Sequence, residues 1–209
     1  MLTGLLGGSF NPAHGGHRSI SLFALDALDL DEIWWLVSPG NPLKADAKDM
    51  ASHKARLASA KKMARRAPIR ATAIEAQMGT RYTIDTLRKL VRRYPRRRFI
   101  WIMGADNVAN FTRWRRWRDV ARLMPIAVIA RPGYEMHAVA GPAMAWLRRY
   151  VRRPDQQLNW TMWSTPALVF LRFRPDPRSA TAVRQANPLW HRDYDGKRVI
   201  GGVTHNVLY

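Results

Sequence analysis

The residues best suited to chemistry lie in one early string, GGSFNPAHGGH at residues 7–17. Its two leading glycines let the backbone approach a ligand closely, and N–H groups in such a loop and at the following helix start favour an anion. His14 and His17 are three residues apart, so they share one side of a first helical turn. Because ring N–H groups can donate hydrogen bonds to phosphate oxygens, the string predicts a phosphate-binding loop.

Two other interpretations of this string stay open. Histidine pairs bind zinc, but no glutamate separates His14 from His17 as in the helical zinc-protease motif, and the sequence identifies no third ligand. We therefore expect no protein metal ligand. A plain turn with two surface histidines would suit one lone histidine better than the whole string. The string is neither a Walker loop nor a GxGxxG motif.

Strand-like and helix-like segments alternate along the chain and must position these residues. We expect strands at residues 2–10, 32–38, 69–74, 98–103, 126–130 and 167–171, and helices at 16–28, 51–66, 83–94 (with Thr83 as N-cap) and 179–185. This alternation indicates an α/β fold, a Rossmann-like doubly wound parallel sheet in a single domain of residues 1–209. Ligands in such sheets bind beyond the C-terminal ends of the strands.

Composition narrows the class of protein. With 47% apolar residues the chain can form a sizeable core, and the absence of cysteine removes disulfides and thiolate chemistry. The N-terminus does not look like a signal peptide, and no apolar stretch is long enough to span a membrane. We therefore expect a cytoplasmic protein that does not bind membranes.

The net charge of +20 attracts anions without saying which. Much of it lies in arginine runs at residues 92–98 and 113–118, which we interpret chiefly as solvated faces. A basic nucleic-acid-binding module is an alternative of another class, but no recognition-helix, RRM, KH or zinc-finger pattern occurs, so we expect no specific nucleic-acid partner. Residues 134–166, rich in Trp, Met and Arg, are expected to form a helical insertion or a partner surface.

The string at residues 7–17 resembles the phosphate-binding signature of the HxGH nucleotidyltransferase superfamily. Within it, the chain is similar to the bacterial nicotinate-nucleotide adenylyltransferases, which show GGxFDPxHxGH there. Asn11 replaces the aspartate, at a position that we take to be structural. Further similarities, in the family's order, are PGNPLK at 39–44, AS at 51–52 with Arg56, YTIDTL at 82–87, GAD at 104–106 followed by Trp114, and RSATAVR at 178–184.

The resemblance implies that the chain joins the adenylyl group of ATP, with Mg²⁺, to nicotinate mononucleotide. It implies catalytic roles for His14, His17 and Arg184. It assigns ATP binding to Gly7, Gly8, Ser9, Phe10, His14, His17, Lys44, Ser179, Thr181 and Arg184, and acceptor binding to Tyr82, Thr83, Asp106, Trp114 and Arg115. A sister enzyme acting on nicotinamide mononucleotide or phosphopantetheine remains an alternative.

Some of these assignments have competitors within the chain. Asp106 could hydrogen-bond a ribose hydroxyl or help to hold magnesium, and we favour the ribose. An aromatic face suits a pyridine ring, so Trp114 is expected to stack on the nicotinate, although Trp117 could take that role instead. Lys44 could equally be an exposed loop lysine. Ser179, Thr181 and Arg184 suit a polyphosphate, but could also form an ordinary helix cap with a surface arginine.

Overall fold

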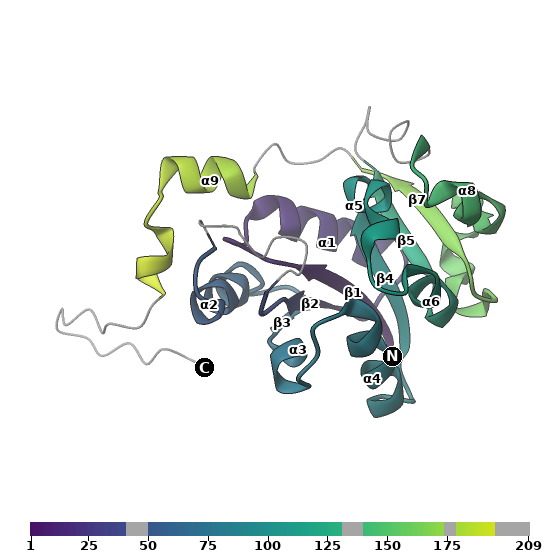
Figure 1. The fold of residues 1–209 in the computed structure, drawn as a ribbon, viewed down its shortest axis with the longest axis horizontal. Coiled ribbons are helices and arrows are strands. Elements are labelled where there is room, and N and C mark those ends of the chain that lie inside the picture. The colour runs from purple at the N-terminus through teal and green to yellow at the C-terminus, as the bar shows by residue number, and fades with distance from the viewer. Residues whose placement is uncertain (41–49, 131–139, 174–178, 195–209) are drawn as a thin grey trace.

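A seven-stranded parallel sheet forms the centre of the molecule in the computed structural model, which describes residues 1–40, 50–130, 140–173 and 179–194 (Figure 1). The strand order is β3-β2-β1-β4-β5-β7-β6, and each neighbouring pair is parallel. The strands are β1 (Leu2–Gly8), β2 (Glu32–Val37), β3 (Ile69–Thr72), β4 (Arg98–Gly104), β5 (Ile126–Ala130), β6 (Val151–Arg152) and β7 (Leu168–Arg172).

Helices connect these strands and cover both faces of the sheet. The α-helices are α1 (Gly15–Ala27), α2 (His53–Met63), α3 (Ile74–Gln77), α4 (Thr83–Arg93), α5 (Ala105–Ala109), α6 (Trp117–Leu123), α8 (Met144–Leu147) and α9 (Ala180–Ala186). Short 3-10 helices are η2 (Phe111–Arg113), η3 (Arg148–Tyr150), η4 (Pro154–Met162) and η5 (Trp190–Asp193). None of the helices in these described ranges is long and apolar enough to cross a membrane.

Two apolar cores lie on opposite faces, as the alternation of side chains along a strand requires. Trp34 and Trp35 are adjacent in β2 and enter different cores. The core with Trp34 is completed by α4 and α6, whereas the core with Trp35 is completed by α1 and α2. The chain therefore folds as an α/β, doubly wound domain, which confirms the predicted fold class.

Three local expectations need correction. The strand predicted at residues 69–74 is shorter in the structure, where β3 ends at Thr72. Ile74 instead begins α3 and is buried there. The helix expected at 51–66 is limited to α2, whose N-cap is Ser52. Thr83 is the first residue of α4 and not its N-cap, since Tyr82 occupies that position without a side-chain cap bond.

The described part of the Trp-rich segment, residues 140–166, packs against the sheet. Trp160 of η4 is 2% exposed, and its Nε1 donates to the carbonyl oxygen of Leu28 at 2.9 Å. Met144 and Leu147 of α8 join the other core. The segment thus stabilises both faces near the β7–β6 edge, and its interpretation as an insertion or a partner surface stays a prediction.

Candidate active site

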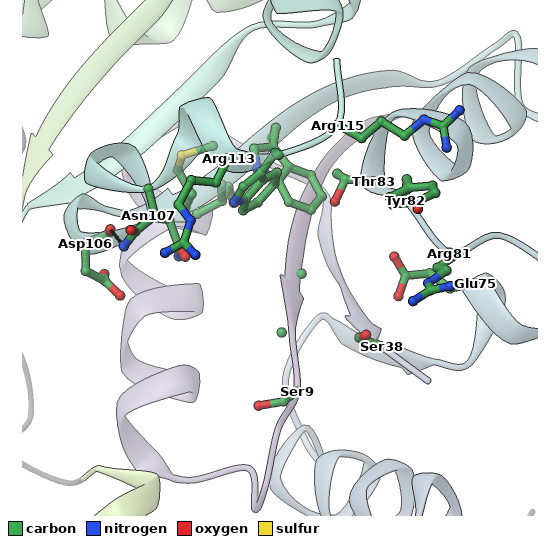
Figure 2. A pocket seen from close by; sticks show the side chains of 17 residues that line it. Ser9, Ser38, Glu75, Arg81, Tyr82, Thr83, Asp106, Asn107, Arg113 and Arg115 are labelled. Carbon is green, nitrogen blue, oxygen red and sulfur yellow. Dashed lines mark hydrogen bonds between the residues drawn. The ribbon is translucent and has the colours of Figure 1, made fainter. Parts of the chain in front are cut away.

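A cavity of about 600 Å³ opens where the chain reverses its path through the sheet. The connections from β1 run toward β3, whereas β4 begins the opposite half, so β1 and β4 separate at their C-terminal ends. Figure 2 shows the lining side chains. They are Gly7, Gly8, Ser9, Ser38, Glu75, Arg81, Tyr82, Thr83, Trp101, Ile102, Met103, Asp106, Asn107, Asn110, Arg113, Trp114 and Arg115.

Two glycines make room for side chains that shape this cavity. A Cβ at Gly7 would lie 2.6 Å from the Trp101 ring, so the tryptophan of β4 can pack against β1 only where β1 has no side chain. A Cβ at Gly104 would lie 2.4 Å from the Asp106 carboxylate. Gly104 therefore lets the exposed Asp106 carboxylate fold back beside the end of β4.

The first loop, residues 9–14, is held by hydrogen bonds to Ser59 in the middle of α2 and to Ala51, just before that helix. The Asn11 Oδ1 accepts from the Ala51 N–H at 3.1 Å, and the Ala13 N–H donates to the Ser59 hydroxyl at 3.1 Å. Asn11 is 4% exposed. The position that differs from the family's aspartate is therefore structural, as expected, because an amide oxygen can accept this backbone bond as well as a carboxylate.

Arg56 joins this loop to the end of β2. Its guanidinium is 1% exposed and donates to the carbonyl oxygens of Ser9 and Ser38 at 2.7 Å each, of Ala51 at 3.0 Å and of Pro39 at 3.1 Å. Burial lowers the pKa of Arg56 from its ordinary value, but a guanidinium stays charged in proteins. Arg56 therefore holds three separate chain segments together beneath the loop.

The two histidines are oriented by the backbone of their own helix turn. His14 is the N-cap of α1 and its Nδ1 accepts from the Gly16 N–H at 3.1 Å, while the His17 Nδ1 accepts from the His14 N–H at 3.2 Å. The rings are 3.9 Å apart between centroids. Since both Nδ1 atoms act as acceptors, the neutral rings carry their protons on Nε2, which makes each Nε2–H a donor.

Phe10 lies beneath the loop rather than in the cavity. It is 1% exposed, stacks on Trp35 at 5.0 Å and contacts the His17 ring at 4.8 Å. Its φ of 49° is a left-handed conformation that costs a non-glycine residue about 1–2 kcal/mol, which burial of the ring offsets. The side chain thus supports His17 from below, so any contact of Phe10 with ATP would use its backbone.

Helix α9 returns from β7 to the opposite side of the molecule, near α1 and α2 (Figure 1). The Ser179 Oγ caps it by accepting from the Ala182 N–H at 3.1 Å. Arg184 donates to the Asn11 carbonyl oxygen at 2.7 Å and to the Thr181 hydroxyl at 3.5 Å. The structure therefore brings Arg184 to the first loop, although the cavity lining includes none of Ser179, Thr181 and Arg184. Lys44 lies outside the described residues.

All five predicted acceptor residues line the cavity, with Tyr82 and Thr83 on one side of it and Asp106 on the opposite side (Figure 2). Tyr82 is the N-cap of α4 and Thr83 is its first residue. The Arg115 guanidinium lies 4.6 Å from the Tyr82 ring centroid. Trp114 lines the cavity and meets Trp101 edge-on at 6.1 Å. Trp117, in contrast, is 8% exposed and packs in the core, so the geometry favours Trp114 as the ring-stacking residue.

Several cavity residues were not predicted from the sequence. Glu75 and Arg81 precede Tyr82, and Arg113 precedes Trp114; each lies one to seven residues from a recognised motif. Burial raises the pKa of Glu75 to about 7, against a smaller opposing effect of the Thr86 hydroxyl. No spacing rule pointed to Glu75, because only the tertiary turn of α3 brings it to the cavity.

The arginine runs lie mainly on solvated faces, as interpreted. Arg92, Arg93, Arg96 and Arg98 are exposed. Other arginines of these runs form ion pairs: Arg97 pairs with Glu32, and Arg116 pairs with Asp119. Asp119 also pairs with Arg88 and Arg122, which lie outside the runs. Within the described residues no three His, Cys, Asp or Glu side chains come together to hold a metal ion.

Comparison with known proteins agrees with this geometry. The cytidylyltransferase-like family matches residues 5–186. A probable nicotinate-nucleotide adenylyltransferase of Erythrobacter litoralis is 64% identical over 99% of this chain and 94% of its own length. Another from Parvibaculum lavamentivorans is 50% identical, over 87% of this chain and 90% of its own length.

Among solved structures, the fold is similar to Plasmodium falciparum nicotinic acid mononucleotide adenylyltransferase complexed with NaAD. The TM-score is 0.62 at 14% identity, with 88% of this chain and 82% of that chain covered. At this identity the likeness supports the fold alone.

Proposed function

This chain belongs to the cytidylyltransferase-like family and, within it, to the nicotinate-nucleotide adenylyltransferases, and we propose that it transfers the adenylyl group of ATP to nicotinate mononucleotide. The products are nicotinate adenine dinucleotide and pyrophosphate, a step of NAD biosynthesis. One observation carries the proposal: a single cavity joins the glycine loop after β1 to the Tyr82, Thr83 and Trp114 wall.

The chemistry requires little from the protein beyond positioning and charge. An oxygen of the acceptor 5′-phosphate attacks the α-phosphorus of ATP, the new P–O–P bond forms, and the bond to the bridging oxygen of pyrophosphate breaks. That attacking oxygen is already an anion at neutral pH, so no protein nucleophile or strong base is required. Catalysis can therefore come from orientation and from donors aimed at the developing charge.

Donors on both sides of the first loop suit the ATP phosphates. The Nε2–H groups of His14 and His17 are fixed by their backbone-bonded Nδ1 atoms, so they need no reorientation to donate. The backbone at Gly8 and Ser9 lines the cavity, and Arg184 is held to the same loop through Asn11. We assign the two histidines and Arg184 to the stabilisation of the crowded phosphates.

The acceptor half uses the opposite end of the cavity. Trp114 offers an aromatic face to the pyridine ring, with Tyr82, Thr83 and Arg115 beside it. Asp106 is suited to a ribose hydroxyl, because its exposed carboxylate lines the cavity next to the end of β4. ATP enters as its Mg²⁺ complex, with the ion bound chiefly by phosphates and water, since a lone carboxylate makes no protein cage. A cytoplasmic location belongs to the same proposal, as the reaction consumes ATP.

The reaction is tested by following the α-phosphate. ATP labelled at the α-phosphorus is incubated with nicotinate mononucleotide, Mg²⁺ and the protein. We expect the label in the dinucleotide and none in pyrophosphate. Label found in pyrophosphate or inorganic phosphate would contradict adenylyl transfer, and dinucleotide formation that persists in His17→Asn at the wild-type rate would contradict the assigned site.

A further inference from the structure

Glu75 is a carboxyl group on the acceptor side of the cavity to which the proposed reaction assigns no role. Figure 2 shows Glu75, Arg81, Tyr82 and Thr83 on one side of the pocket, with Asp106 and Asn107 on the opposite side. The residue that binds the pyridine ring under the proposed function, Trp114, lines the same pocket. A bound acceptor would therefore bring its ring substituent into the electrostatic environment of Glu75.

The Glu75 carboxyl group receives little hydrogen-bond support. Within the part of the chain that the structure describes, its hydroxyl partner is Thr86, 3.5 Å from Oε1. The Thr86 hydroxyl is also shared with Thr80 at 2.7 Å and with the Tyr82 carbonyl oxygen at 3.4 Å. The backbone of Glu75, in contrast, is fixed, because its carbonyl oxygen accepts from the Thr80 N–H at 2.9 Å. The turn thus holds the carboxyl group at the cavity wall without strongly stabilising its charge.

Charged groups of both signs line the same cavity as Glu75. Arg81 lies on the turn before α4, Arg113 and Arg115 flank Trp114, and all three line the cavity. The elements around it carry further titratable or charged groups. Tyr82 precedes α4, which carries Asp85, Arg88, Lys89, Arg92 and Arg93, and Asp106 lies on α5. Strand β2 carries Glu32 and β3 carries Arg70, while the neutral Ser38, just after β2, lines the cavity. No ion pair between Glu75 and these described residues lies within 4 Å, so burial dominates and raises the pKa of Glu75 to about 7.

We propose that Glu75 is a specificity-determining residue for the acceptor ring: its neutral form admits a ring carboxylate, and its ionised form repels that carboxylate but not a carboxamide. The inference rests on the proposed function. Nicotinate and nicotinamide mononucleotides share the pyridinium charge and the phosphate, so they differ only in this substituent. Discrimination between them should consequently change with pH near neutrality.

The test measures kcat/KM for both acceptors at saturating MgATP from pH 6 to pH 8.5. Taking their ratio at each pH cancels the titration of the shared phosphate, whose second pKa is near 6. Below pH 7 Glu75 is mostly neutral and the ratio favours nicotinate mononucleotide most. As pH rises through 7 and Glu75 ionises, we expect the ratio to fall roughly 3- to 30-fold, the range for two like charges several ångströms apart in a partly solvated site.

Two variants make the result specific. Glu75→Gln should give a ratio that is independent of pH and close to the wild-type value at pH 6. Asp155→Asn removes an exposed carboxylate that pairs with Arg153 and should keep the wild-type slope. A flat wild-type ratio, or a slope that survives in Glu75→Gln, overturns the inference while leaving the proposed function intact. No product from nicotinate mononucleotide at any pH contradicts the proposed function itself.

A second measurement does not depend on the variant folding. The chain contains three glutamates, so the carboxyl carbon of Glu75 can be followed by NMR in the labelled wild-type protein. By linkage, bound nicotinate mononucleotide should raise the pKa of Glu75 more than bound nicotinamide mononucleotide does. Equal pKa values in the two complexes would overturn the inference.

Discussion

The Arg184 guanidinium donates from Nη1 to the carbonyl oxygen of Asn11 at 2.7 Å, across 173 positions of sequence. Asn11 is itself held by Ala51 through its side-chain oxygen. Helix α9 is therefore attached to the first loop through a residue that is itself hydrogen-bonded to Ala51. Under the proposed function, the ATP contacts that we assign to α9 depend on this attachment.

Removal of that contact should weaken ATP binding more than it changes folding. In Arg184→Ala, we expect KM for ATP to rise about tenfold or more. The reason is that the proposed function gives Arg184 a charge-assisted hydrogen bond to an ATP phosphate, and such a bond contributes roughly 1.5–3 kcal/mol. Arg184→Lys keeps the positive charge but lacks the planar guanidinium group. Its KM for ATP should therefore lie between those of the wild type and Arg184→Ala. Steady-state kinetics with ATP varied decide this, and an unchanged KM in Arg184→Ala would show that α9 contributes no ATP contact.

The His17 side chain has two separable tasks, and Asn can separate them. His17→Asn places an oxygen near the position of Nδ1, so it can still accept from the His14 N–H, but it lacks the Nε2–H donor. We expect kcat to fall on the order of 100-fold with little loss of thermal stability. His17→Ala should lose similar activity and, in addition, about 0.5–2 kcal/mol of stability with the cap bond. Near-wild-type turnover in His17→Asn would refute the donor role.

Trp114 and Trp117 are three residues apart but differ in surroundings. Trp114→Ala should cost roughly 1–3 kcal/mol of acceptor binding, by analogy with bases stacked on aromatic residues, and raise acceptor KM about 5- to 150-fold. Trp117 packs on Phe111 and Trp146 at about 5.5 Å, so Trp117→Ala should instead destabilise the fold by about 3–5 kcal/mol. An acceptor-specific defect in Trp117→Ala and none in Trp114→Ala would reverse the assignment.

Arg56→Ala should be strongly destabilising, because it leaves four carbonyl oxygens in and near the first loop without their donor. We expect a loss of about 3 kcal/mol or more in the free energy of unfolding, measured by urea denaturation. Arg65→Ala, which alters an exposed arginine at the end of the same helix, should change stability by less than about 0.5 kcal/mol. Equal midpoints for the two variants would contradict the role of Arg56.

The sequence predicted what depends on periodic burial and on local motifs. Ile84, Leu87, Leu90 and Val91 recur at helical spacing in α4, whose predicted ends were accurate within one residue. The first three are fully buried, whereas Val91 is 37% exposed. Strand β6 and helix α3 are too short to show a periodic pattern of apolar residues. The network around Arg56 could not be predicted, because its acceptors are backbone atoms of three segments that only the fold brings together. The resemblance favoured Trp114 over Trp117, and the burial of Trp117 in the core, which the sequence did not show, agrees with that choice.

The central claim, adenylyl transfer to nicotinate mononucleotide, is tested most directly by a steady-state panel. MgATP is offered with nicotinate mononucleotide, nicotinamide mononucleotide or phosphopantetheine, and pyrophosphate release is measured to give kcat/KM for each. We expect nicotinate mononucleotide to have the highest value at pH 7. The highest value for phosphopantetheine would contradict the assigned acceptor, and no pyrophosphate release with any of the three would contradict the reaction.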